Sequence, residues 1–213
     1  MQVAEAFKYE RVVDDICALN WDSLTENDLT VATWAYYFFS IQFRENLEIA
    51  CELFPDDPKL LQLEREECNT DNLSPWPNVA GAGEKMNHDE FMARLLKLSP
   101  ISAEKRTFLE EIGQDYLDQV RATPRAVRAL SIASYEDGGL EKVFQAFLTA
   151  QHWNTPLLQA FKHFLTEHIR FDSDPEQGHG SLSRHITPDD RILPLWSAFD
   201  RLLVQAIPHL RSA

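Results

Sequence analysis

The residues best suited to chemistry lie between positions 164 and 180, where His168 and Asp172 could bind a metal ion together. His168 and Asp172 are four residues apart, so on a helix they would share one face. His179 follows seven residues later, beyond Pro175. A histidine and a carboxylate at this spacing suit iron or manganese, and facing helices in bundles often build sites from such pairs. The same spacing also fits a surface pair or a histidine satisfied within a core.

Glu136 is a second candidate ligand, because it interrupts a helix that otherwise has the pattern of a core element. It lies in the stretch Tyr-Glu-Asp-Gly-Gly, with apolar residues on both sides. A carboxylate buried there would need a metal or another partner to offset its desolvation. Gly138 and Gly139 weaken the helix, and such weak points often coincide with π-bulges at functional sites. The alternative is a helix break with Glu136 in solvent.

A carboxylate and a histidine also flank the loop between residues 69 and 83, which is rich in Asn, Pro and Gly. His88 lies at the start of the helix that follows this loop. The helix before it ends in several acidic residues, and the residues alone do not choose among Glu64, Glu66 and Glu67. Surface charge is the competing interpretation for all three.

The elements that would position these residues are helices. Apolar residues recur at three- to four-residue spacing, Pro and capping residues mark the ends, and no segment alternates like a strand. We expect one domain over residues 1–213, an all-α bundle of seven to eight helices. The expected helices cover approximately residues 3–19, 28–54, 57–68, 87–98, 102–121, 124–149, 156–172 and 193–210.

Composition excludes several classes of protein. The formal net charge of -14 disfavours binding to nucleic acid or to an acidic membrane surface. The three cysteines form neither a CxxC pair nor a disulfide framework, which fits a reducing cytoplasm. The N-terminal residues do not resemble a secretory signal, and the most apolar stretch is too short to span a bilayer. The sequence therefore predicts a cytoplasmic protein without membrane or nucleic-acid partners.

Taken together, three segments resemble the haem-oxygenase-like diiron oxidase and oxygenase superfamily, which shares its helical fold with haem oxygenases, TenA and PqqC. They are Glu-Glu-Cys-Asn-Thr-Asp followed by Asn-His-Asp-Glu-Phe, then Tyr-Glu-Asp-Gly-Gly, and finally His-Ile-Arg-Phe-Asp with the later Gly-His-Gly. The resemblance covers most of the chain and implies a haem-oxygenase-like fold. It implies the metal ligands Glu67, His88, Glu136, His168, Asp172 and His179, with Glu45 as a further candidate on the second helix.

Two departures from the superfamily pattern leave the exact set of metal ligands undecided. The last histidine usually stands three residues after the aspartate, a position that Pro175 holds here. Either the helix breaks at Pro175 and His179 swings back as a ligand, or the second metal position is incomplete. The interval from Glu67 to His88 is also longer than usual, which bears on the identity of the upstream carboxylate.

The resemblance implies a chemistry as well as a ligand set. Such enzymes hold two ferrous ions, which are readily lost, and use O2 as co-substrate through a peroxo species. They oxidise small molecules by N-oxygenation, oxidative decarboxylation or carbon–carbon cleavage in specialised biosynthesis. We expect an amino-acid-like substrate in preference to a fatty-acid-like one, and a homodimer as the commonest assembly. Aromatic residues that could line the pocket are Tyr36, Tyr37, Trp76 and Tyr135, and the loop with Trp76 could act as a lid.

Two other functions compete with this one. A cofactorless enzyme of the same fold, like TenA or PqqC, would use the same polar residues as acids and bases, and Cys68 is the one cysteine placed to act as a nucleophile. A non-catalytic helical adaptor would bind a basic partner through its acidic surface. The haem oxygenase reaction itself is disfavoured, because no histidine precedes His88 to ligate haem near the N-terminus.

Overall fold

The structure, a computed structural model, describes residues 7–211 apart from 72, 74, 99 and 173–177. In that part the chain is helical and contains no strand, only two isolated β-bridges in the loop after residue 68. This confirms the all-α bundle. The α-helices are α1 (Lys8–Cys17), α2 (Glu26–Leu53), α3 (Pro58–Glu67), α4 (His88–Leu95), α5 (Ala103–Arg121), α6 (Arg125–Ser134), α7 (Leu140–Phe147), α8 (Pro156–Asp172), α9 (His179–Ser183) and α10 (Leu193–Ala206).

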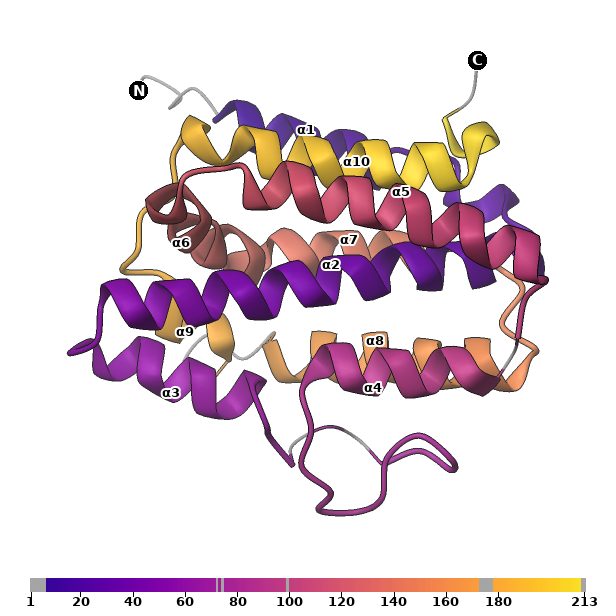
Figure 1. Cartoon of the computed structure of the whole chain (residues 1–213), viewed down its shortest axis with the longest axis horizontal. Coiled ribbons are helices and arrows are strands. Elements are labelled where there is room, and N and C mark those ends of the chain that lie inside the picture. Colours follow the sequence, from indigo (N-terminus) through magenta and orange to yellow (C-terminus); the bar gives the residue numbers. More distant parts are fainter. Residues whose placement is uncertain (1–6, 72, 74, 99, 173–177, 212–213) are drawn as a thin grey trace.

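Helix α2 is the axis of the bundle. Figure 1 shows it crossing the middle of the molecule, with α1, α5 and α10 on one side and α3, α4 and α8 on the other. It contacts α3, α4, α5, α6, α8 and α10, which explains why its middle is apolar on nearly every face. The Thr25 side chain caps it by accepting a hydrogen bond from the Asp28 amide at 3.2 Å, and Pro55 follows its end.

Most expected helices are present with small shifts at their ends. The predicted helix over residues 124–149 is interrupted by a π turn, Tyr135–Gly139, between α6 and α7. The predicted last helix ends at Ala206, because Pro208 starts a separate 3-10 turn. The short helix α9 was not predicted, since five residues after a proline-containing stretch carry too little periodicity.

Glycines make the π turn possible. Gly138 has φ +92°, a left-handed conformation that residues with a Cβ rarely adopt. A Cβ on Gly139 would lie 2.0 Å from the Ser134 carbonyl oxygen and 3.0 Å from the Trp196 ring. The two glycines that suggested a weak point in the helix therefore permit a specific change of backbone direction, beside Glu136.

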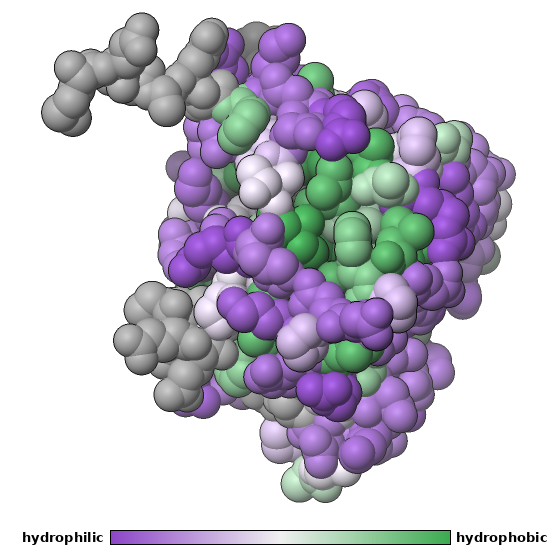
Figure 2. Space-filling view, turned by 90° about the vertical axis from the view of Figure 1, so that its left-hand side faces the viewer, coloured by the Kyte–Doolittle hydropathy of each residue, from purple (hydrophilic) through white to green (hydrophobic). Residues whose placement is uncertain are grey.

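The surface agrees with the acidic composition. Figure 2 shows hydrophilic side chains over most of one side of the molecule, around a smaller area of hydrophobic ones. Among the described helices, none combines the length and apolar character needed to cross a bilayer.

Candidate metal centre

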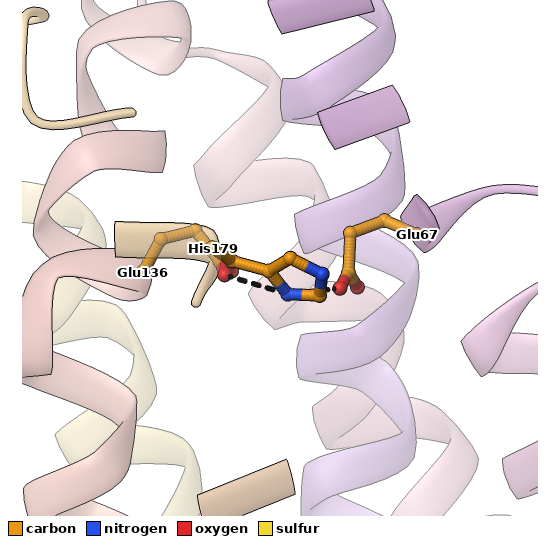
Figure 3. Close-up of side chains that lie close together, drawn as sticks. All are labelled: Glu67, Glu136 and His179. Carbon is orange, nitrogen blue, oxygen red and sulfur yellow. Dashed lines mark ion pairs between the residues drawn. The ribbon is translucent and has the colours of Figure 1, made fainter. Parts of the chain in front are cut away.

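Three buried side chains from separate elements lie close together inside the bundle. Glu67 is the last residue of α3, Glu136 lies in the π turn and His179 is the first residue of α9. Their exposed fractions are 4%, 8% and 3%. His179 Nδ1 lies 2.6 Å from Glu67 Oε1 and 3.4 Å from Glu136 Oε2, so the imidazole stands between the two carboxylates (Figure 3). One ligand atom from each residue lies within 4.8 Å of the others, close enough for a shared metal ion.

Helix α9 holds His179 in place through contacts with α3 and the π turn. A Cβ on Gly180 would lie 3.0 Å from the Glu136 carbonyl oxygen, so a larger residue would have to displace the π turn by a few tenths of an ångström. Arg184 donates to both oxygens of the Asp137 carboxylate at 2.8–3.2 Å. Toward α3, His185 Nε2 lies 2.5 Å from Oδ2 of Asp57, the residue that caps that helix. The chain beyond Pro175 therefore returns to the bundle and brings His179 to the other ligands.

His88 extends this group of ligands from the first residue of α4. Its Nδ1 lies 2.9 Å from Glu67 Oε2, so each oxygen of Glu67 faces one imidazole. His88 is 7% exposed, and its Nε2 is buried without a hydrogen-bond partner among the described residues. If Nδ1 carries the proton shared with Glu67, Nε2 has a lone pair available for a metal ion.

His168 lies next to His88, with ring centroids 4.9 Å apart. Its Nδ1 lies 2.9 Å from the Phe164 carbonyl oxygen, an arrangement in which Nδ1–H donates and Nε2 carries the lone pair. Asp172 is the last residue of α8, and its side chain lies outside the described part of the structure. The predicted pairing of His168 with Asp172 stays a prediction.

Electrostatics favour an ionised Glu67. Burial raises the pKa of this carboxyl, but His88 and His179 lower it by more, so the net pKa lies well below the usual value. Glu66 is the next nearest acid, with Oε2 3.3 Å from His179 Nε2. Of the three upstream candidates, Glu67 is therefore the one placed at the centre, and Glu66 lies at its edge.

Two small cavities adjoin the ligands. One of about 130 Å³ is lined by Glu67, His88, His168 and His179 on its polar side. The other, of about 20 Å³, is lined by Glu67, His88, Glu136 and His168. The aromatic residues of the walls include Phe91, Phe144, Phe164 and Phe171. Each of the five described candidate ligands thus lines at least one of the two cavities, and Glu67, His88 and His168 line both.

The predicted pocket aromatics separate into different places. Tyr36 lines the smaller cavity. Tyr135 is buried on the other side of the π turn, where its hydroxyl bonds to Gln42. Tyr37 lines a different cavity, between α2, α4 and α5. The Trp76 ring packs at a tilt against His163, with 5.0 Å between the ring centroids.

Glu45 is not brought to the ligand group. Its carboxylate accepts from Arg121 Nη2 at 2.6 Å and from Arg128 Nη2 at 2.8 Å. Two guanidinium groups compensate its charge, so the structure gives it a role in an ion-pair network between α2, α5 and α6.

Cys68 is poorly suited to nucleophilic catalysis. Burial raises the pKa of its thiol to about 12, with further contributions from Glu67 and other acids. A thiolate is therefore scarce near neutral pH, which argues against a TenA-like role.

Sequence reasoning missed the cavity mouth, which includes Glu167, Arg170 and Phe171. The signal was available, because Phe171 follows Phe164 by seven residues and thus shares its helical face. It also missed the Asp137–Arg184 ion pair, for which no local pattern exists.

No family model, curated protein or solved structure matches this chain. The geometry of the site therefore carries the functional argument.

Proposed function

We propose that this chain is a non-haem, iron-dependent oxidase or oxygenase that acts on a small molecule with O2 as co-substrate. The observation that supports it best is the meeting of Glu67, Glu136 and His179 from three separate elements in a buried place. Two carboxylates this close repel each other unless a cation or a proton lies between them. Carboxylate and imidazole donors in a helical bundle suit iron or manganese.

The remaining histidines fit the same proposal. The unpartnered Nε2 of His88 is a buried acceptor that a metal ion would satisfy. His88 and His168 each have Nδ1 beside an oxygen, which orients the ring and keeps the proton off Nε2. Two carboxylates and three imidazoles would hold about two iron ions, namely those of Glu67, Glu136, His88, His168 and His179.

Bound iron would supply the activation of O2. The protein's own residues would bind and orient the substrate and enclose it in the cavity. Phe91 and Phe164 form an apolar wall of the larger of the two cavities at the metal centre, and we expect this wall to exclude water. Arg170 and Glu167, at the mouth of the cavity, pair with each other at 3.1 Å. A substrate with both an anionic and a cationic group could exchange this pair for its own contacts with the two side chains. An amino-acid-like substrate matches this pair better than a plain fatty acid.

Iron content tests the proposal. Purified protein is loaded anaerobically with ferrous iron, desalted and analysed for metal, and O2 uptake is then followed. We expect about two irons per wild-type chain and loss of most of this iron in His179→Ala, because His179 lies between both carboxylates. His163→Ala is the matched control, since His163 packs on Trp76 and should leave iron binding intact. Failure of the wild-type protein to retain ferrous or manganous ion would reject the proposal and favour acid–base catalysis without metal.

A further inference from the structure

A second, larger cavity lies away from the candidate metal centre. It has a volume of about 560 Å³ and lies between α2, α4 and the first half of α5. Figure 1 shows the connection from α4 to α5 at the end of the molecule opposite α9. None of the residues that line the cavity lines either cavity of the metal centre. It is therefore a separate site.

The walls of this cavity are largely apolar. They include Trp34, Phe38, Ala93, Leu96 and Ile101. The position of the Phe38 ring depends on Gly113, where a Cβ would lie 2.2 Å from the ring. A volume of this size matches the pockets that bind small molecules, and its lining suits an apolar body.

One buried donor in the wall has no acceptor. Trp34 is only 7% exposed, and its Nε1 lacks a hydrogen-bond partner among the described residues. Buried indole N–H groups normally have a partner, and leaving one unsatisfied destabilises the protein. A ligand that brings an acceptor oxygen would remove this cost.

The charges at the cavity favour an anion. Lys97, Arg106 and Glu110 are the charged residues of the lining, and Arg106 Nε pairs with Glu110 Oε1 at 2.8 Å. Lys97 therefore gives the cavity a net positive charge, in a chain of net charge -14. The Arg106 guanidinium lies over the Trp34 ring, 5.8 Å from its centroid, so this cation and the indole belong to the same wall. Lys97 has no ion-pair partner among the residues that the structure describes.

We propose that this cavity binds a small amphipathic monoanion, with its apolar body between α2 and α4 and its anionic group near Lys97, Arg106 and Trp34. The site does not depend on the metal centre. A neutral ligand would leave Lys97 without a counter-charge, and two copies of a chain with net charge -14 repel each other overall.

Calorimetric titration with decanoate tests the proposal, with decanol as the neutral analogue of equal chain length. We expect one decanoate per wild-type chain, bound at least about tenfold more tightly than decanol. Ala93→Phe fills the cavity and should weaken decanoate binding by at least about tenfold, whereas Ala126→Phe, at an exposed alanine of α6, should not. Arg106→Gln should weaken decanoate about three- to tenfold and leave decanol unchanged.

Three results would overturn the proposal. The first is the absence of saturable decanoate binding by a wild-type protein of native circular dichroism. The second is binding that Ala93→Phe leaves unchanged although the variant is folded. The third is a wild-type dimer, by light scattering, that Ala93→Phe dissociates and decanoate does not, which would identify the cavity as a subunit interface. Iron content plays no part in these measurements, so their outcome is independent of the proposed oxidase function.

Discussion

Tyr135 and Glu136 are neighbours in the chain but belong to two different buried polar groups. The Tyr135 hydroxyl accepts from Gln42, which itself accepts from Tyr116. Glu136 lies on the other side of the π turn, beside His179. We call the first group the amide–tyrosine network, which consists of Gln42, Asn46, Tyr116, Arg128, Ser131 and Tyr135.

The polar side chains of the amide–tyrosine network form hydrogen bonds with one another. Asn46 donates to Ser131 at 3.0 Å and accepts from Arg128 at 2.7 Å, and Ser131 donates to the Arg128 carbonyl at 2.6 Å. No buried side-chain N or O atom of its members lacks a hydrogen-bond partner in the described structure. Such a network stabilises the packing of α2 on α5 and α6.

The candidate metal centre differs from this network in its charge and in its hydrogen bonding. It places two carboxylates close together, and it leaves Nε2 of His88 without a partner among the described residues. Buried polar groups that the chain itself does not satisfy indicate a site for something else. Burial of polar groups alone therefore does not indicate a functional site, whereas buried donors or acceptors without partners in the chain do.

Substitution of Gly139 should have the largest effect, because it alters the turn that separates the two groups. Gly139→Ala would force a Cβ to within 2.0 Å of the Ser134 carbonyl oxygen, so we expect a loss of about 2–4 kcal/mol in unfolding free energy together with loss of iron binding. Gly81→Ala is the control, since its Cβ would lie no closer than 3.5 Å to any neighbour. Chemical denaturation and metal analysis measure the two effects, and an unchanged midpoint for Gly139→Ala would refute the assigned role of the turn.

Paired substitutions at Tyr135 and Glu136 should separate stability from metal binding. Tyr135→Phe removes a buried hydroxyl that Gln42 requires, and we expect it to cost about 1–2 kcal/mol while iron binding is retained. Glu136→Gln removes one of two neighbouring carboxylates, so the metal-free protein should be at least as stable while iron affinity falls at least about tenfold. Equal effects of the two substitutions on iron binding would remove the distinction between the groups.

Arg184 offers a test of whether α9 must be held for His179 to bind metal. Arg184→Gln breaks the ion pair with Asp137, and we expect about three- to tenfold weaker iron binding without a change in fold. Arg191→Gln, which breaks an exposed pair with Asp189 nearby in the chain, is the matched control. Competition against a chelator of known affinity gives the values, and identical affinities for the two variants would contradict a positioning role.

Acid titration should give the smallest effect. Burial raises the pKa of Glu45, but Arg121 and Arg128 lower it by more, so its folded pKa lies below the usual 4.5. A depressed folded pKa contributes stability above the unfolded pKa, and this contribution is lost as the pH falls through the folded value. We expect wild type to lose up to about 1 kcal/mol more than Glu45→Gln when urea unfolding is measured at pH 3.5 instead of pH 7. Parallel losses in the two proteins would show that this ion pair adds nothing.

The sequence by itself determined the class of fold and most of the helices. Apolar periodicity, capping residues and prolines are local signals, so the ends of α2, α3, α5 and α8 fell close to their expected positions. The weak point at Gly138 and Gly139 was also visible, since glycine disfavours a helix wherever it occurs. These features depend on residues only a few positions apart.

Which of the candidate ligands lie together depends on the tertiary packing of the helices and could not be read from the sequence. Glu67 was not distinguishable from Glu64 and Glu66 by type or spacing, and burial against His88 and His179 selects it. His179 lies 112 residues from Glu67, and its place depends on the packing of Gly180 and the pairing of Arg184 with Asp137. Contacts between residues far apart in the chain leave no periodic trace in the sequence. Their positions follow from the close packing of the whole bundle.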